Sequence, residues 1–262
     1  MRQRVGALHL VPVPIIDEPA GASTVGSAHR VLPPSTIEVV RQARYFLAEN
    51  ARSARAFIKA IAHPQPIASL QIVQIGHEPD AASIDQWLAP LTDRDGRPAI
   101  DAVLLSEAGC PGVADPGATL VARAHTLGIK VVPWVGPSSI LLALMAAGMN
   151  GQRFRFLGYL PQPSVALRDR LLAVQRDAQR GETQVFIETP YRNARLFETI
   201  LKVCDRTLRL CLAIDLTGAN QTIATRTIAQ WLAMADDDRP ALDRRATVFL
   251  LHAGPASAPA PA

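Results

Sequence analysis

The chain has 262 residues, of which 48% are hydrophobic and 19% are charged, with a formal net charge of +4 and a pI near 9.3. This length suits one large or two ordinary domains, and the composition is that of a globular protein. No run of 18 apolar residues indicates a membrane span, and the N-terminus lacks the apolar stretch of a secretory signal, so we expect a cytoplasmic protein. The three cysteines, Cys110, Cys204 and Cys211, follow no disulfide or metal-ligand spacing.

Short strand-like runs alternate with longer amphipathic stretches along the first half of the chain, which favours an α/β architecture. The strands predicted there are residues 8–13, 45–48, 70–75, 102–105 and 129–134. The predicted helices are residues 35–43, 51–61, 84–91, 115–127 and 140–147, and Ser35 or Thr36 would cap the first of them. Residues 16–34 are rich in Gly, Ala, Ser and Pro and are predicted to form a long loop.

The pattern breaks around residues 148–153, where we place a boundary between an N-terminal domain, 1–148, and a C-terminal domain, 149–253. Strands are then predicted at residues 154–159, 184–188, 208–214, 221–227 and 247–251, and helices at 163–180 and 194–203. Short connections between the last strands indicate a sheet that is partly antiparallel. The small, proline-rich residues 254–262 are predicted to be a disordered tail.

The segment from Ser106 to Gly117 is the most informative part of the sequence. A hydrophobic strand ends in a loop that holds three glycines and two prolines, and a helix follows. Glycine allows a ligand to approach the main chain closely, and ligands bind at the carboxyl ends of strands in open α/β sheets. A tight strand-to-helix connection without any ligand is the alternative.

A second turn of this kind, residues 135–139, follows the predicted strand 129–134. It reads Val-Gly-Pro-Ser-Ser, and the two loops would lie side by side along one edge of a sheet. Hydroxyl groups at the start of a helix can cap it and can also meet polar groups of a ligand. Capping alone explains one serine, whereas the pairing of the two loops favours a ligand site.

Both loops resemble motifs of the tetrapyrrole methylase superfamily. The similar branch 2′-O-methylates a cytidine of small-subunit ribosomal RNA and carries motifs close to Asp-Ala-Gly-Thr-Pro-Gly-Ile-Ser-Asp-Pro-Gly, Pro-Gly-Pro-Ser-Ala and Phe-x-Phe-x-Gly-Phe-Leu-Pro. The last motif matches residues 154–161, and residues 186–192 are similar to the branch's Phe-Tyr-Glu-Ser-Pro-His-Arg. Residues 212–217 lie where the branch has Ala-Arg-Glu-Leu-Thr-Lys, and the resemblance extends over roughly residues 8–251.

The resemblance implies a homodimeric methyltransferase with two α/β domains, mixed sheets flanked by helices, and S-adenosylmethionine bound in an interdomain cleft. It implies no metal. The cofactor contacts that it implies are Pro14, Ser106, Gly109, Cys110, Pro111, Ser138, Ser139, Glu188, Ala213 and Thr247. The substrate contacts that it implies are Glu49, Arg52, Tyr191, Arg192 and Asp215.

Three segments depart from the branch's pattern on the substrate side of that cleft. The first loop, Thr-Pro-Ile-Gly-Asn-Leu in the branch, is Val-Pro-Ile-Ile-Asp-Glu at residues 13–18. Ala-Glu-Asp-Thr-Arg has become Ala-Glu-Asn-Ala-Arg at 48–52, and Arg-Glu-Leu-Thr-Lys has become Ile-Asp-Leu-Thr-Gly at 214–218. Three hypotheses therefore stay open: a methyltransferase of ribosomal RNA, a methyltransferase of a tetrapyrrole or another small molecule, and a cofactor-binding module without turnover.

The chemistry of methyl transfer leaves the catalytic residues open. Transfer from a sulfonium is an in-line displacement, to which positioning contributes much of the rate. A hydroxyl nucleophile can also need a base, and the carboxylates at predicted strand ends are Glu49, Glu107, Glu188 and Asp215. Basic side chains that could contact RNA phosphates are Arg52, Arg55, Lys59, Arg153, Arg155, Arg168, Arg170, Arg192 and Arg195. A solvated face is the alternative for most of them, with Arg192 set apart because it lies within a motif.

Overall fold

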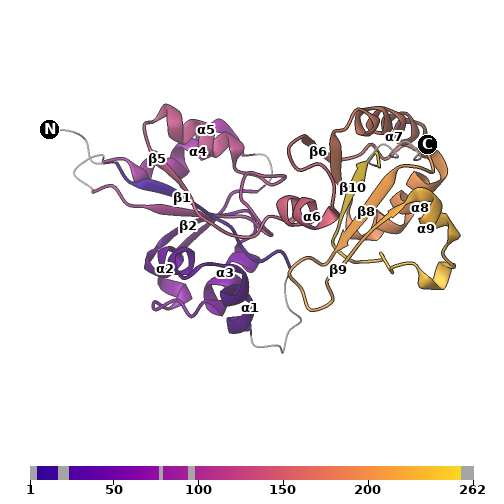
Figure 1. Cartoon of the computed structure of the whole chain (residues 1–262). Helices are drawn as coiled ribbons and strands as arrows, with labels where there is room; N and C mark the ends of the chain where they lie inside the picture. The colour runs from indigo at the N-terminus through magenta and orange to yellow at the C-terminus, as the bar shows by residue number, and fades with distance from the viewer. Residues whose placement is uncertain (1–4, 17–23, 77–78, 94–97, 255–262) are drawn as a thin grey trace. The chain divides into compact units, whose positions relative to one another are not determined.

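The computed structural model describes residues 5–16, 24–76, 79–93 and 98–254. The chain divides into two compact units, residues 1–138 and 139–262, and each unit holds one five-stranded sheet flanked by helices (Figure 1). The α/β class predicted from the sequence is thereby confirmed. Of the predicted tail, all but Gly254 lies outside the described residues. Within those described residues, no helix combines the length and the apolar character needed to cross a membrane.

The first sheet is parallel throughout, in the order β3-β2-β4-β1-β5. Its strands are β1 (Ala7–Val11), β2 (Tyr45–Ala48), β3 (Gln71–Gln74), β4 (Ala102–Leu105) and β5 (Lys130–Pro133). Every residue of β2 and β4 is buried, as expected for parallel strands covered on both faces. Because the five strands run in the same direction, their carboxyl ends all meet at one edge of the sheet.

Helices cover both faces of the first sheet (Figure 1). Side chains alternate along β4, so that Val103 packs with α1 (Thr24–Val31), α2 (Pro34–Gln42) and α3 (Ala51–Ala60). Leu104 packs on the other face with α4 (Ala81–Leu88) and α5 (Ala118–Thr126). Two short 3-10 turns, η1 (Ile67–Ser69) and η2 (Ala89–Leu91), complete the described elements of this unit.

Three predictions of local structure in this unit were wrong. The predicted loop 16–34 contains helix α1, whose Ala28 is buried in the core, while residues 17–23 lie outside the described part. Helix α2 begins at Pro34, so its N-cap is Pro33, which has no side-chain acceptor, and neither Ser35 nor Thr36 caps it; the Thr36 hydroxyl donates to the Val135 carbonyl at 2.8 Å. Helix α5 begins only at Ala118, since the preceding glycine has a backbone φ of 129° that no helix accommodates.

The second sheet is mixed, in the order β6-β7-β10-β8-β9. Its strands are β6 (Phe154–Tyr159), β7 (Thr183–Ile187), β8 (Arg209–Ile214), β9 (Thr222–Thr227) and β10 (Thr247–His252). Strands β6 and β7 are parallel, whereas β10 is antiparallel to both β7 and β8, and β9 is antiparallel to β8. This arrangement confirms the partly antiparallel sheet that the short connections predicted.

One face of the second sheet packs on α7 (Ser164–Gln179), α8 (Asn193–Val203) and α9 (Ile228–Ala233), with Leu212 and Phe249 in the shared core. Helix α6 (Ser139–Ala147) lies on the opposite face, because its Ala147 carbonyl accepts the Thr225 hydroxyl at 2.9 Å. The domain boundary at residue 148, after α6, stays a prediction; the second compact unit of the structure begins at Ser139, the first residue of α6. The 3-10 turns η3 (Pro190–Arg192) and η4 (Asp236–Asp238) also belong to the second unit.

Candidate functional site

The loops that follow β1, β4 and β5 are bonded to one another at the carboxyl edge of the first sheet. Val13 N–H donates to the Gly109 carbonyl at 2.9 Å, and Gly109 N–H returns a bond to the Val13 carbonyl at 3.2 Å. On the other side, Cys110 Sγ donates to the Pro137 carbonyl at 3.4 Å. The two loops predicted to lie side by side do meet, with the end of β1 between them in the sheet order.

Two glycines of this edge have distinct roles. Gly109 is buried with φ of 70°, a left-handed conformation that side-chain-bearing residues rarely adopt. Gly136 is needed for space, because a Cβ there would lie 2.5 Å from Pro12 Cβ, well inside van der Waals contact. The edge is also braced from within by the buried Ser106 hydroxyl, which donates to the Gly109 carbonyl at 2.8 Å. A shape made in this way by the main chain is insensitive to side-chain motion.

The other expected cofactor residues of the first unit lie along the same loops. Pro14 is half-buried directly after Val13, and Pro111 is buried within the loop 106–117. Ser138 is the last residue of the first unit, and Ser139 is the first residue of α6 in the second unit. The pKa of the Cys110 thiol is raised by burial and by the negative charge of Asp115, so this side chain is a neutral thiol near pH 7.

Glu49 and its neighbours join the end of β2 to the start of the same loop. The buried Glu49 carboxylate accepts the Glu107 N–H at 3.1 Å, and Asn50 Nδ2 donates to Glu107 Oε1 at 3.2 Å. Asn50 Oδ1 also accepts the Arg52 N–H at 2.9 Å and so caps α3. Arg52, Arg55 and Lys59 are exposed on α3. Glu49 therefore has an observed structural partner on the main chain.

One edge of the second sheet gathers the expected site residues of that unit. Thr247 pairs with Ile214, and the next residue of β10 pairs with Ile187. Because β10 is antiparallel to both neighbours, its first residue lies beside the last residues of β7 and β8, after which Glu188 and Asp215 follow. Ala213 is buried within β8.

Glu188 and Arg192 form an ion pair at this edge, with 2.7 Å between Oε1 and Nη2. The same Glu188 oxygen accepts the Thr189 N–H at 2.6 Å, and the side chain is only 9% exposed. A pocket of about 110 Å³ lies beside this pair. Its lining residues are Pro161, Gln162, Leu167, Glu188, Arg192, Arg195 and Leu196. Tyr191, by contrast, is largely exposed.

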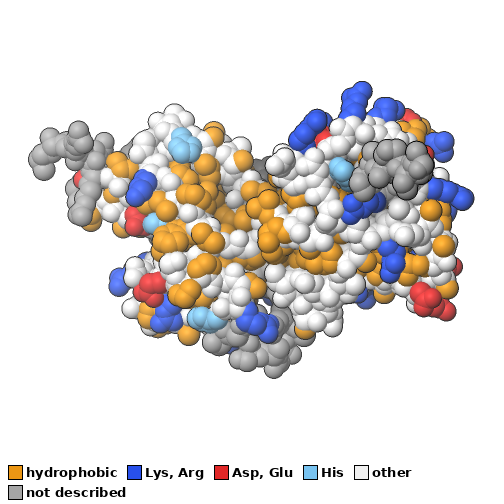
Figure 2. Space-filling view, viewed as in Figure 1, with side chains coloured by type: hydrophobic (Ala, Val, Ile, Leu, Met, Phe, Trp, Pro, Cys, Tyr) orange, Lys and Arg blue, Asp and Glu red, His pale blue; other side chains and the backbone are white. Residues whose placement is uncertain are grey.

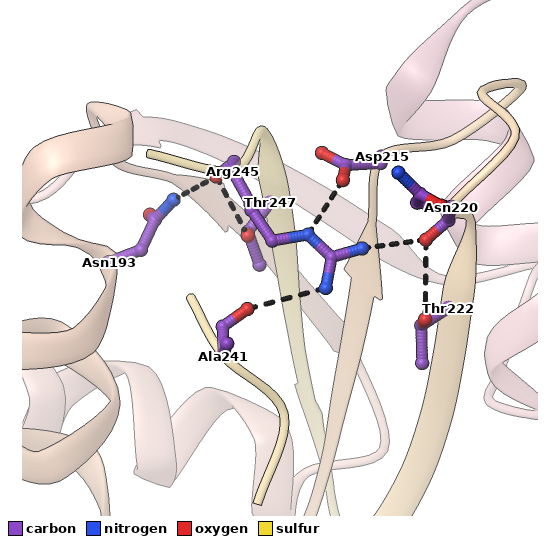
Figure 3. A network of polar contacts seen from close by, with 7 residues as sticks. All are labelled: Asn193, Asp215, Asn220, Thr222, Ala241, Arg245 and Thr247. Carbon is purple, nitrogen blue, oxygen red and sulfur yellow. Dashed lines mark hydrogen bonds and ion pairs between the residues drawn. The ribbon is translucent and has the colours of Figure 1, made fainter. Parts of the chain in front are cut away.

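Arg245 is the centre of a polar network that joins four segments of the second unit (Figure 3). Its Nε donates to Asp215 Oδ2 at 2.6 Å, and its Nη2 donates to the Asn220 carbonyl at 2.6 Å. Its own carbonyl accepts Asn193 Nδ2 at 2.6 Å and the Thr247 hydroxyl at 3.1 Å. Arg245 was not predicted as a site residue, because no motif in the sequence distinguishes it from the adjacent Arg244.

These contacts narrow the roles of the candidate carboxylates. Glu188 and Asp215 are paired with arginines, and Glu49 holds a main-chain amide, so each has a structural role in the described fold. Glu107 is exposed, and its side chain accepts the Asn50 amide. We assign no general base. Within the described part of the chain, no group of three or more His, Cys, Asp and Glu side chains is arranged to hold a metal ion.

The fold is that of an α/β protein with two units, and bonded loops lie at the carboxyl edge of its parallel sheet. This edge is where open α/β sheets bind their ligands. The profile of the tetrapyrrole (corrin/porphyrin) methylases matches residues 28–231. The chain belongs to this family of methyltransferase enzymes. The crystal structure of the methyltransferase CobJ has the same fold, with a TM-score of 0.58 at 17% identity over 95% of this chain and 94% of that chain.

Curated relatives are similar over part of their length. Ribosomal RNA small subunit methyltransferase I of Vibrio cholerae is 36% identical over 152 residues, 57% of this chain and 50% of the relative. The Pseudomonas aeruginosa protein of that name is 38% identical over 51% of this chain and 47% of the relative. The Xylella fastidiosa protein is 28% identical over 86% and 73%. The chain thus spans about half the length of the first two relatives.

Proposed function

We propose that this chain is an S-adenosylmethionine-dependent methyltransferase that binds its cofactor at the carboxyl edge of the first sheet and methylates RNA of the small ribosomal subunit. The observation that carries the proposal is the bonding of three strand-end loops into one edge, through Val13, Gly109, Cys110 and Pro137. The loops of that edge are rich in glycine, proline and small residues, which let a ligand approach the main chain closely.

The charge of these loops fits the proposed cofactor. Residues 12–16, 106–117 and 134–139 contain no lysine or arginine, and they include the carboxylates Glu107 and Asp115. A phosphate-bearing cofactor is commonly held by basic side chains, whereas a sulfonium cation is not. When bound, S-adenosylmethionine supplies a methyl group on a positively charged sulfur. The residues of the chain bind and orient it, and the neutral Cys110 thiol adds no charge to that task.

The charge of the second unit supports an RNA substrate. Residues 139–262 contain 15 basic and 11 acidic residues, whereas residues 1–138 contain 12 of each, so the second unit holds all of the net charge of +4. Figure 2 shows Lys and Arg side chains over the region of β6 and α7 in this unit. Polyanions bind such surfaces with an affinity that falls as salt rises. The similar proteins named ribosomal RNA small subunit methyltransferase I agree with this substrate class.

A tetrapyrrole or another small molecule is the second candidate substrate, because the matching family is named for corrin and porphyrin methylation. Its binding would depend little on salt and would not be displaced by RNA. A homodimer in the cytoplasm and cofactor contacts from Glu188, Ala213 and Thr247 remain predictions of the family resemblance. Light scattering of the purified chain tests the dimer.

Isothermal titration with S-adenosylmethionine and S-adenosylhomocysteine tests the cofactor site. We expect micromolar binding to the unaltered chain and loss of binding in Gly109→Val. Gly128→Val is the matched control, because Gly128 has nearly the same φ, 69°, with nothing within 4 Å of an added Cβ, and follows α5. Both variants bear the same left-handed strain, so only the site should differ. Unchanged affinity in a folded Gly109→Val variant would remove this loop from the site.

Methyl transfer is then measured with radiolabelled cofactor. We expect label in small ribosomal subunits or their RNA when these come from cells that lack this protein, and none in subunits that are already modified. Label in a tetrapyrrole instead would support the second candidate. Cofactor binding without transfer to either would indicate a binding module without turnover.

A further inference from the structure

Tyr191 is a large aromatic side chain that the fold leaves 76% exposed on the η3 turn. The guanidinium carbon of Arg244 lies 6.0 Å from its ring centroid, within the range of a cation–π contact. The ring nevertheless stays accessible, so it can meet a further partner. An exposed ring next to a cation is the combination that proteins use to hold an unpaired base beside its phosphate.

The backbone on either side of Tyr191 is held by two hydrogen bonds. Arg244 N–H donates to the Pro190 carbonyl at 3.2 Å, and Asn193 Nδ2 donates to the Arg245 carbonyl at 2.6 Å. Asn193 is fully buried, and Arg244 has a left-handed φ of 57°. Two segments about fifty residues apart are therefore bonded on both sides of Tyr191. A side chain whose backbone is already held in place loses less conformational freedom when a ligand binds.

Positive charge continues from the ring into the neighbouring pocket. Arg192 and Arg195 line the pocket of about 110 Å³, and the buried Arg192 Nε has no hydrogen-bond partner in the described part of the chain. Two carboxylates face this group of arginines: Glu188 pairs with Arg192, and Asp243 lies 3.7 Å from Arg244. Within the described part of the chain, Arg195 forms no ion pair, so its charge is not matched by a bonded carboxylate, whereas the acidic side chains of Glu198, Asp236 and Asp237 line another pocket together with Asp243.

We propose that Tyr191, Arg192, Arg195 and Arg244, called here the Tyr191 platform, bind single-stranded RNA. A base stacks on the Tyr191 ring, and the arginines contact the phosphates on either side of it. Stacking requires a base that is free of its own helix, so the platform selects unpaired nucleotides over duplex. This inference rests on the proposed function for the class of substrate, and it assigns the contact to particular side chains.

Fluorescence anisotropy with a labelled, unstructured oligoribonucleotide of about 12 nucleotides tests the platform. We expect Tyr191→Ala to weaken binding about tenfold and Tyr191→Phe to bind like the unaltered chain, since stacking needs the ring and not the hydroxyl. Arg244→Gln should weaken binding about threefold and lower the slope against log salt by about 1. Arg176→Gln is the control, because Arg176 is an exposed arginine on α7 of the same unit.

Several outcomes would overturn the platform: equal affinity for a duplex of the same sequence, no effect of Tyr191→Ala, or a Phe variant as weak as the Ala variant. Binding of a carboxylated porphyrin that depends on Tyr191, without any RNA binding, would also overturn it. Titration of the same variants with S-adenosylmethionine separates the two proposals. If Tyr191→Ala loses the cofactor too, the ring belongs to the cofactor site. If the unaltered chain binds RNA but no cofactor, the proposed function fails and the platform stands.

Discussion

The two sheet edges that hold the candidate residues are built in different ways. The edge of the first sheet is shaped by the main-chain hydrogen bonds between Val13 and Gly109. It is also shaped by Gly136, which leaves no room for a side chain. At the edge of the second sheet, side-chain ion pairs of Arg192 and Arg245 set the shape. Main-chain geometry suits a ligand of constant shape, such as a cofactor, whereas side chains can change with the substrate. Net charge divides in the same way, neutral in the first unit and +4 in the second.

The largest expected effect tests the first edge. Gly136→Ala places a methyl group 2.5 Å from Pro12 Cβ and 3.0 Å from Leu32 Cδ2, so the loops after β1 and β5 must separate. We expect a loss of about 3 kcal/mol in the free energy of unfolding and at least tenfold weaker cofactor binding. Gly151→Ala is the control, because an added Cβ there has nothing within 4 Å. Urea unfolding measures the free energy of unfolding, and calorimetric titration measures cofactor binding. If Gly136→Ala changes neither quantity, this edge is not tightly packed.

The next effect tests how the second edge is held. Arg245→Met leaves Asp215 without its arginine, and the two side chains are only 25% and 18% exposed. We expect a loss of about 2 kcal/mol in unfolding free energy. Arg123→Met breaks an Arg–Asp pair of the same 2.6 Å length whose side chains are 40% and 49% exposed, and it should cost less than about 1 kcal/mol. Equal losses of unfolding free energy in the two variants would show that the Arg245 network stabilises the fold no more than an exposed ion pair does.

A smaller effect is expected at the Glu188–Arg192 pair, where two variants distinguish a substrate contact from a cofactor contact. Arg192→Ala should lower methyl transfer to RNA about tenfold with unchanged cofactor affinity, since a phosphate contact is lost. Glu188→Gln should instead weaken cofactor binding, because the resemblance assigns Glu188 to the cofactor. Titration and steady-state kinetics on both variants provide the test. A fall in cofactor affinity in Arg192→Ala would move this arginine to the cofactor side.

The smallest effect is a pH dependence of the second unit. Burial raises the pKa of Cys204 to about 12, above an ordinary thiol value of about 8.5. The unfolded chain therefore releases this proton first, so the stabilising contribution of the thiol is complete below about pH 8.5 and is lost as pH rises toward 12. Between about pH 8.5 and 9.5 we expect stability to fall by up to about 1 kcal/mol more in the unaltered chain than in Cys204→Ala. Parallel pH profiles of the two proteins would contradict this.

Local sequence patterns predicted most of the helices and strands. Each of the ten strands overlaps a predicted one, because a short apolar run such as Ala102–Leu105, bounded by Asp101 and Ser106, has few other ways to be buried. Helix α9 was missed although its start carries a readable signal. Thr227 and Gln230 form a capping box, but the helix is only six residues long. Helix α1 carries no such capping signal: its first residues are small, and its first turn contains no acidic residue, although its Ala28 is buried in the core.

The sequence by itself determined the α/β class, the family motifs and the presence of two Gly- and Pro-rich loops at strand ends. Only the tertiary structure decided that β1 lies between β4 and β5, so that Val13 joins the loop of Gly109. It also decided that Arg244 lies beside Tyr191 and that Arg245 holds Asp215. Local patterns act over a few residues, whereas strand order and side-chain partners depend on how distant segments pack, and no short stretch of sequence contains that information.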